Sequence, residues 1–144
     1  MANCDCKVML ASGPLGSISP ETTLGAGAIV EFFGNVRPLE NGEQIEGIEY
    51  EAHRDMAEHQ LRKIAHEAAE QFDLLTIKLY HSVGFVAVGE TSLFLRVAAA
   101  HRGVAFEASR WTIDELKKRV TIWKSVRFRV GSAREKERSA PALA

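Results

Sequence analysis

The sequence predicts an α+β protein with a mainly antiparallel sheet and two principal helices. Three observations lead to this fold class: several short segments alternate apolar and polar residues, two segments have helical periodicity, and very short spacers separate the later strands. Such spacers suit hairpins, because a parallel crossover needs a dozen or more connecting residues. An order of strands, helix, strands and helix is typical of α+β domains.

Three strands are expected in the N-terminal half. Residues 7–11 form a short first strand, and the nearly all-apolar residues 26–33 form a buried one. Residues 48–52 alternate apolar with charged or polar side chains, which is the pattern of a half-buried strand. The polar segment before this last strand contains Asn41-Gly42, a pair that favours a turn or a flexible loop.

The first helix follows these strands. Asp55 is the predicted cap, and Glu58 lies three residues later in the capping-box position. Apolar residues then recur at steps of three and four and form one stripe: Ala57, Leu61, Ile64, Ala65, Ala68 and Phe72. His59 and His66 lie off this stripe among charged residues, and we expect them to be solvated rather than to bind a ligand.

The second half repeats the pattern. Residues 75–80, 85–88 and 91–99 are predicted to be three strands, separated by glycine-containing spacers. A second helix is expected to begin just after a His-Arg pair and to run to about residue 120.

Length and composition bound the class of protein. The chain has 144 residues, which predicts one domain over residues 1–131 and a disordered, charged and then Ala/Pro-rich tail over 132–144. A formal net charge of −1 argues against a protein that coats nucleic acid. No apolar run approaches the roughly 20 residues of a membrane span, and no signal-peptide pattern is present, so a cytoplasmic location is expected. Cys4 and Cys6 are expected to be free thiols, because a lone Cys-x-Cys lacks the four ligands of a zinc site.

Candidate functional residues are cations rather than nucleophiles. Arg37 follows a buried strand, where a loop can present it to a ligand. His101-Arg102 lies at a strand-to-helix junction, where free N–H groups and the helix dipole favour an anion. Lys117 lies near the end of the second helix, and Lys124 follows a tryptophan that can partly desolvate it. Together they indicate a small anionic, phosphate-like ligand, although each alone could be a solvated surface residue.

These residues belong to segments that resemble the large, catalytic subunit of molybdopterin synthase. The similarity extends from about residue 7 to residue 124. The matching segments are GAIVEFFGNVR (27–37), IEYEAH (48–53) with MA (56–57), VGE (88–90), AHR (100–102) with AF (105–106), ID (113–114), LK (116–117) and IWK (122–124).

The resemblance implies a fold of the α/β hammerhead type and a sulfurtransferase of molybdenum cofactor biosynthesis. Family members convert cyclic pyranopterin monophosphate into molybdopterin by installing two dithiolene sulfurs. The sulfur arrives as a thiocarboxylate on the C-terminal Gly-Gly of a small ubiquitin-like subunit, and two catalytic subunits dimerise at the centre of a heterotetramer. No cofactor and no metal are expected, and neither a nucleic acid nor a membrane is an expected partner.

The resemblance also implies roles for individual residues. The residues expected to bind substrate are Asn35, Arg37, His101, Arg102, Lys117, Lys124 and Ser125. Arginine suits a phosphate because its planar fork binds two oxygens, and the His101-Arg102 pair resembles one contributed across the dimer. Lys117 and Lys124 are the expected catalytic residues. We assign Lys117 to the partner's tail and to developing oxyanion charge, and Lys124 to substrate positioning and proton transfer.

The chain departs from the family pattern beside this site. Thr121 replaces a common proline, Ser125 and Val126 replace a basic-acidic pair, and His81-Ser82 replaces a frequent His-Arg. Arg127 or a tail residue is a candidate to compensate for the missing acidic group. Two alternatives therefore stay open beside an active enzyme: a catalytically weakened paralogue that binds the ubiquitin-like tail as an interaction module, and a binding domain for another phosphorylated small molecule.

Overall fold

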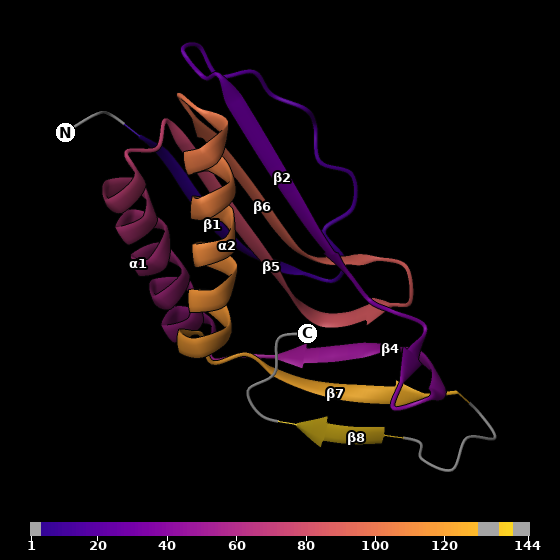
Figure 1. Cartoon of the computed structure of the whole chain (residues 1–144). Helices are drawn as coiled ribbons and strands as arrows, with labels where there is room; N and C mark the ends of the chain where they lie inside the picture. Colours follow the sequence, from indigo (N-terminus) through magenta and orange to yellow (C-terminus); the bar gives the residue numbers. More distant parts are fainter. Residues whose placement is uncertain (1–3, 130–135, 140–144) are drawn as a thin grey trace.

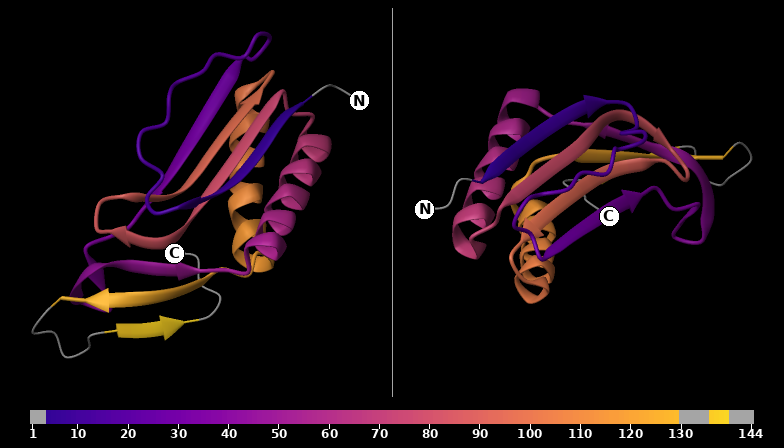
Figure 2. Two further views of the ribbon diagram at one scale, coloured as in Figure 1. Left: turned by 180° about the vertical axis from the view of Figure 1, so that it is seen from behind. Right: turned by 90° about the horizontal axis from the view of Figure 1, so that it is seen from above.

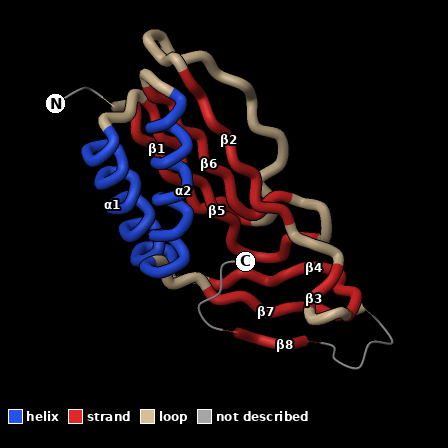
Figure 3. The backbone as a smooth tube through the Cα atoms, in the orientation of Figure 1, coloured by secondary structure: helices blue, strands red, loops and turns tan. Residues whose placement is uncertain are grey.

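The computed structural model describes residues 4–129 and, for the backbone, residues 136–139 (Figure 1 and Figure 3). Its elements in chain order are β1 (Asp5–Ser12), β2 (Ala28–Asn35), β3 (Leu39–Glu40), β4 (Glu43–Glu51), α1 (Arg54–Phe72), β5 (Thr76–Ala87), β6 (Thr91–Ala99), α2 (Arg102–Arg119), β7 (Trp123–Phe128) and β8 (Lys136–Ser139). The α+β class and the two principal helices are confirmed.

The sheet has two parts that share β5. The first part of β5 lies between β1 and β6, and β2 pairs with the other side of β6. The end of β5 pairs with β4, which continues into β7 and β8. Figure 1 shows the β4-β7-β8 part crossing below the longer strands. All pairs are antiparallel except β1 with β5, a parallel pair that the sequence did not predict.

One long strand replaces two predicted ones. The sequence predicts a break between residues 80 and 85, but β5 runs through Gly84 without interruption. Gly84 has φ +92°, a conformation that glycine adopts readily because it has no Cβ. Its partner in β4 is Tyr50, at the end of the β4 pairing, so this bend marks the point where β5 passes to its second set of neighbours.

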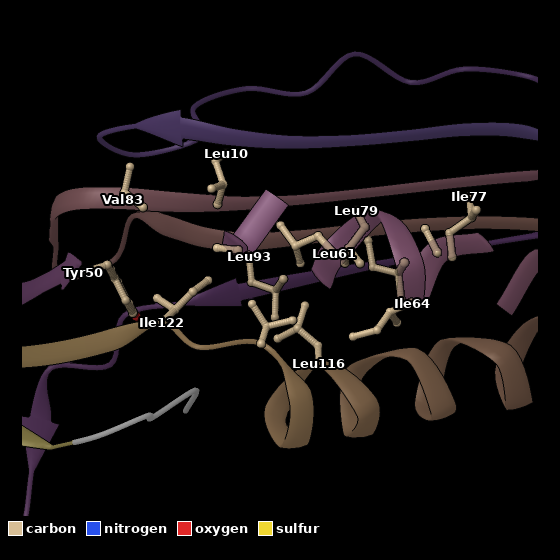
Figure 4. Close-up of a cluster of buried hydrophobic side chains, with 14 of the residues drawn as sticks. Leu10, Tyr50, Leu61, Ile64, Ile77, Leu79, Val83, Leu93, Leu116 and Ile122 are labelled. Atoms are coloured by element: carbon tan, nitrogen blue, oxygen red, sulfur yellow. The ribbon is translucent and has the colours of Figure 1, made fainter. Parts of the chain in front are cut away.

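Both helices cover the same face of the main sheet, as the two views in Figure 2 show. The predicted apolar stripe of α1 is buried except for Phe72, which is partly buried, and His59 and His66 are exposed. Figure 4 shows Leu61 and Ile64 of α1 in one apolar cluster with Leu116 of α2 and with Leu79 of β5. The predicted cap is wrong by two residues, because the Nδ1 atom of His53 accepts the Met56 N–H at 3.3 Å.

The remaining differences lie at the edges of the sheet. The predicted turn at Asn41-Gly42 is present, with positive φ at both residues, and it joins β3 to β4. β7 was not predicted. Residues 132–144 were predicted to be disordered, but 136–139 form β8 and pair with the otherwise open edge of β7; the rest of that tail lies outside the described residues. Neither described helix is long and apolar enough to span a membrane.

Gly47 tests the pairing of β4 with β5. A Cβ atom there would lie 2.4 Å from the carbonyl oxygen of Val86 and 2.5 Å from the Phe85 ring, and the backbone oxygen cannot move aside cheaply. We expect Gly47→Ala to lower the free energy of unfolding by about 1–3 kcal/mol in urea titrations. Gly103→Ala is the control, because no atom lies within 4 Å of its Cβ position, and a gain of about 0.5–1 kcal/mol is expected in this helix. Equal midpoints for Gly47→Ala and the wild type would show that this register is wrong.

Candidate active site

A pocket lies where the end of β2 approaches β4, β5 and β6. Its walls come from five parts of the chain: Gly34, Asn35, Val36, Arg37, Glu40, Ile48, Tyr50, His81, Ser92 and Leu93. Two predicted substrate-binding residues, Asn35 and Arg37, are therefore brought together here. Most of the other polar lining residues were not predicted.

Arg37 is presented by the chain that leaves β2. The Asn35 side chain accepts a hydrogen bond from Thr91 Oγ1 at 2.7 Å, and Val36 N–H donates to the Glu90 carbonyl at 3.0 Å. These two bonds fix the end of β2 against the start of β6. Arg37 comes next and is exposed, with no ion pair among residues 4–129. A fixed backbone and a free guanidinium suit it to bind an anionic ligand.

A hydrogen-bonded tyrosine forms one wall of the pocket. Tyr50 Oη donates to Ser92 Oγ at 3.2 Å, and Ser92 Oγ donates to the Gly34 carbonyl at 3.4 Å. Burial raises the pKa of the Tyr50 phenol, partly offset by the bond to Ser92. The phenol is therefore neutral at physiological pH and acts as a fixed dipole.

His81 forms the floor of the pocket. Its ring is 1% exposed and meets the Tyr50 ring edge-on, with centroids 5.2 Å apart. Its Nδ1 atom lies 2.7 Å from the Ser82 carbonyl oxygen, which can only accept, so we assign the proton to Nδ1. Burial lowers the pKa of His81 to about 4, against a smaller opposite effect of this hydrogen bond. The imidazole is neutral at physiological pH, and the nearby cations are not opposed by a charge of their own sign.

This buried histidine predicts a pH dependence of stability. The unfolded chain takes up a proton near pH 6.5, whereas folded His81 resists it until about pH 4. Stability is therefore fully present above pH 6.5 and falls as the pH drops, by at most about 3 kcal/mol. Thermal unfolding between pH 7 and 4.5 should show this slope in the wild type and lose most of it in His81→Asn. His66→Asn, on the exposed face of α1, should keep it, and an unchanged slope in His81→Asn would contradict the assignment.

Lys124 lies next to this wall. It is directly opposite Tyr50 in the β4–β7 pairing, so both side chains project from the same face of the sheet. Lys124 is 8% exposed, and within residues 4–129 it forms no printed-range hydrogen bond or ion pair with an acidic group. A buried cation is costly unless something compensates its charge. An anionic ligand is the compensation that this position suits.

Lys117 differs from its two neighbours on α2. Lys118 pairs with Glu115 at 3.6 Å, and Arg119 pairs with Glu67 at 2.7 Å as well as with Glu115. Lys117 is exposed and forms no ion pair within residues 4–129. The run of three cations is thus divided: two are used to join elements of the fold, and Lys117 is available to a ligand or a partner.

The His101-Arg102 pair lies at the other end of the sheet. β2 and β6 are antiparallel, with Asn35 opposite Thr91 and Ala28 opposite Ala99. The nine residues of β6 therefore separate Arg37 from the start of α2 by about 30 Å. His101 and Arg102 are exposed there, and a single chain does not bring them to the pocket (Figure 1).

Ser125 faces away from Lys124, because successive strand residues point to opposite sides. It lies opposite Glu49, which forms an ion pair with Arg127 at 3.3 Å, and the Arg127 guanidinium lies 4.3 Å from the centre of the Phe85 ring. Arg127 is thus engaged on that face and does not act as a substitute partner for Lys124. Neither Ser125 nor Arg127 is placed at the pocket by this geometry.

Tyr50, His81 and Ser92 were not predicted as part of the site. A signal was present, since polar side chains occur at strand positions that should be buried, but the pocket exists only after β2, β4, β5 and β6 pair. Within the described residues, no group of three or more His, Cys, Asp or Glu side chains is arranged to hold a metal ion.

The fold and the site define an α+β protein that collects unpaired cations around a neutral pocket, which is the arrangement of an enzyme subunit for an anionic substrate. The model of the MoaE protein family matches residues 15–119. The molybdopterin synthase catalytic subunit of Thermoplasma volcanium is 40% identical over 111 residues, 77% of this chain and 81% of that protein. Molybdopterin synthase from Staphylococcus aureus superposes with a TM-score of 0.72 at 30% identity, over 81% of this chain and 83% of that one.

The chain belongs to the MoaE family, the catalytic subunits of molybdopterin synthase, which transfer sulfur in molybdenum cofactor biosynthesis. A complex of subunits 1 and 2 of the molybdopterin-converting factor from Helicobacter pylori shares the fold, with a TM-score of 0.67 at 22% identity over 83% of each chain.

Proposed function

We propose that this chain transfers sulfur from the thiocarboxylated C-terminus of a small ubiquitin-like subunit to cyclic pyranopterin monophosphate, which makes the molybdopterin dithiolene. The observation that carries the proposal is the set of unpaired cations at one end of the fold: Arg37 at the pocket, Lys124 beside its tyrosine wall, and Lys117 at the end of α2. Such a set binds a phosphate and stabilises negative charge that develops in acyl transfer.

The cysteines support delivery of sulfur by another protein. Cys4 and Cys6 lie at the start of β1, whose partner residues Thr76 and Ile77 begin β5, whereas the pocket lies near the other end of β5. Burial raises the pKa of Cys4 to about 11 and also raises that of Cys6. Both are protonated at physiological pH and are poor nucleophiles. The reaction proposed here needs no cofactor and no metal, because the thiocarboxylate supplies the sulfur.

The two lysines take different roles in this proposal. Lys117 is exposed and can reach the tail of the partner, where it stabilises the oxyanion that forms when the thiocarboxylate carbon is attacked. Lys124 is buried beside Tyr50 and positions the pterin and moves its protons. Asn35 and Arg37 bind the phosphate end of the substrate.

A second copy of the chain completes the site in this proposal. His101 and Arg102 lie about one strand length from Arg37 in the same chain, so they can reach a phosphate held by Arg37 only from another subunit. We therefore propose a homodimer at the centre of a heterotetramer, with one small subunit on each catalytic subunit. The two-subunit complex from Helicobacter pylori supports the small partner.

Reconstitution tests the function. The chain is incubated with a thiocarboxylated ubiquitin-like protein that ends in Gly-Gly and with cyclic pyranopterin monophosphate, and the dithiolene is followed as a derivatised product. Product formation is expected. Tight binding of the tail without product would instead identify an interaction module. Binding of neither would favour a domain for another phosphorylated ligand.

A further inference from the structure

The connection between α2 and β7 links the two lysines of the site. It consists of residues 120–122, three positions after Lys117 and directly before the strand that carries Lys124. Ile122 N–H donates to the Val120 carbonyl at 3.2 Å, which makes a three-residue turn centred on Thr121. Thr121 is not among the described residues with positive φ, so this is the inverse γ-turn, with central φ near about −75°.

Two side chains of α1 hold this connection. Thr121 N–H donates to Gln60 Oε1 at 3.0 Å, and just before the turn Arg119 makes a two-pronged contact with Glu67, at 2.9 and 2.7 Å. Gln60 and Glu67 are seven residues apart, so they share one face of α1. The turn is also fixed by apolar contacts, since Val120 is 1% exposed and Ile122 is 0% exposed. Figure 2 shows the connection beside the start of α1.

We propose that Gln60 is a positioning residue for sulfur transfer: by accepting the Thr121 N–H it fixes the turn and therefore the position of Lys124 relative to Lys117. The inference rests on the function proposed above. No other hydrogen-bond acceptor for the Thr121 N–H is found among residues 4–129, so without Gln60 the half-buried group either stays unpaired or moves to find another partner.

The same geometry supplies a rescue. A proline at position 121 has no N–H to satisfy, and its φ of about −65° matches an inverse γ-turn. The preceding residue, Val120, is already extended, with φ −94° and ψ 125°, as a residue before proline prefers. Thr121→Pro therefore replaces the hydrogen bond to Gln60 by a covalent restriction of the same turn.

The test compares four chains in single-turnover sulfur transfer. Gln60→Met keeps the size of the side chain but removes the acceptor, and we expect kcat to fall about 3- to 10-fold. KM for the pterin should stay unchanged, because the phosphate grip at Arg37 does not depend on this turn. The double variant Gln60→Met/Thr121→Pro should recover the rate of the wild type. Gln71→Met, at an exposed position of α1, is the control and should have no effect.

A second measurement does not depend on catalysis. The side-chain 13Cε chemical shifts of Lys117 and Lys124 should change in Gln60→Met and return in the double variant. If the wild type makes no dithiolene, the proposed function fails, and these shifts alone decide the positioning role. Gln60→Met that lowers thermal stability but leaves kcat and both lysine shifts unchanged would show a purely structural role and overturn the inference, as would a double variant that stays impaired.

Discussion

Lys124→Met is expected to abolish sulfur transfer while leaving the chain at least as resistant to heat as the wild type. Lys124 is 8% exposed and has no acidic partner within residues 4–129, so its charge is a cost to the folded state that methionine removes at similar size. In the reaction the same charge faces an anionic substrate, and removing one such group lowers kcat by about 10²–10³-fold. Opposite effects on activity and stability are typical of a residue that is kept for function.

Two measurements check this result: dithiolene formation in single turnover, and thermal unfolding without substrate. Lys118→Met is the control, because Lys118 is exposed and paired with Glu115, away from the pocket, and it should leave the rate unchanged. A Lys124→Met chain that unfolds at a clearly lower temperature would mean that the ammonium stabilises the fold, which would remove the main argument for its role at the site.

Arg37→Ala and Arg102→Ala are each expected to be nearly inactive, yet to restore activity when combined in one dimer. Loss of a charge-assisted hydrogen bond to the phosphate should reduce kcat/KM by about 10- to 100-fold in either variant alone. The two residues lie at opposite ends of β6, so each site takes them from different chains. In a twofold dimer of one variant with the other, one site loses both arginines and the second keeps both, which gives about half of the wild-type activity.

Co-expression of the two variants with different affinity tags, followed by two successive purifications, isolates the mixed dimer. A dimer of Arg37→Ala with a differently tagged Arg37→Ala is the matched control and should stay inactive. If the mixed dimer is no more active than its parents, both arginines serve one site within a single chain, and the strand-length separation would have to be closed by a rearrangement of the fold.

Local patterns predicted the regular elements well where one face of an element is buried. The stripe on α1 from Ala57 to Phe72 needed only helical periodicity, and the turn at Asn41-Gly42 needed only residues that adopt positive φ. The break predicted near Gly84 was wrong because a glycine can bend a strand as well as end it. β7 was missed because Lys124 and Ser125 are buried by pairing with β4 and β8, which no local pattern shows.

The sequence by itself determined the chemistry available: the fixed cations, the absence of a cysteine near them, and the order of helices and strands that places a histidine and an arginine at the start of α2. These follow from residue type and spacing. Only the tertiary structure decided which cations are free. It used Lys118, Arg119 and Arg127 in ion pairs, left Lys117 and Lys124 unpaired within residues 4–129, and separated Arg37 from Arg102 by the length of β6. Pairing between distant segments sets these outcomes, because a charge is neutralised by whatever lies across the sheet or the helix interface, and the neighbouring residues in the chain do not reveal it.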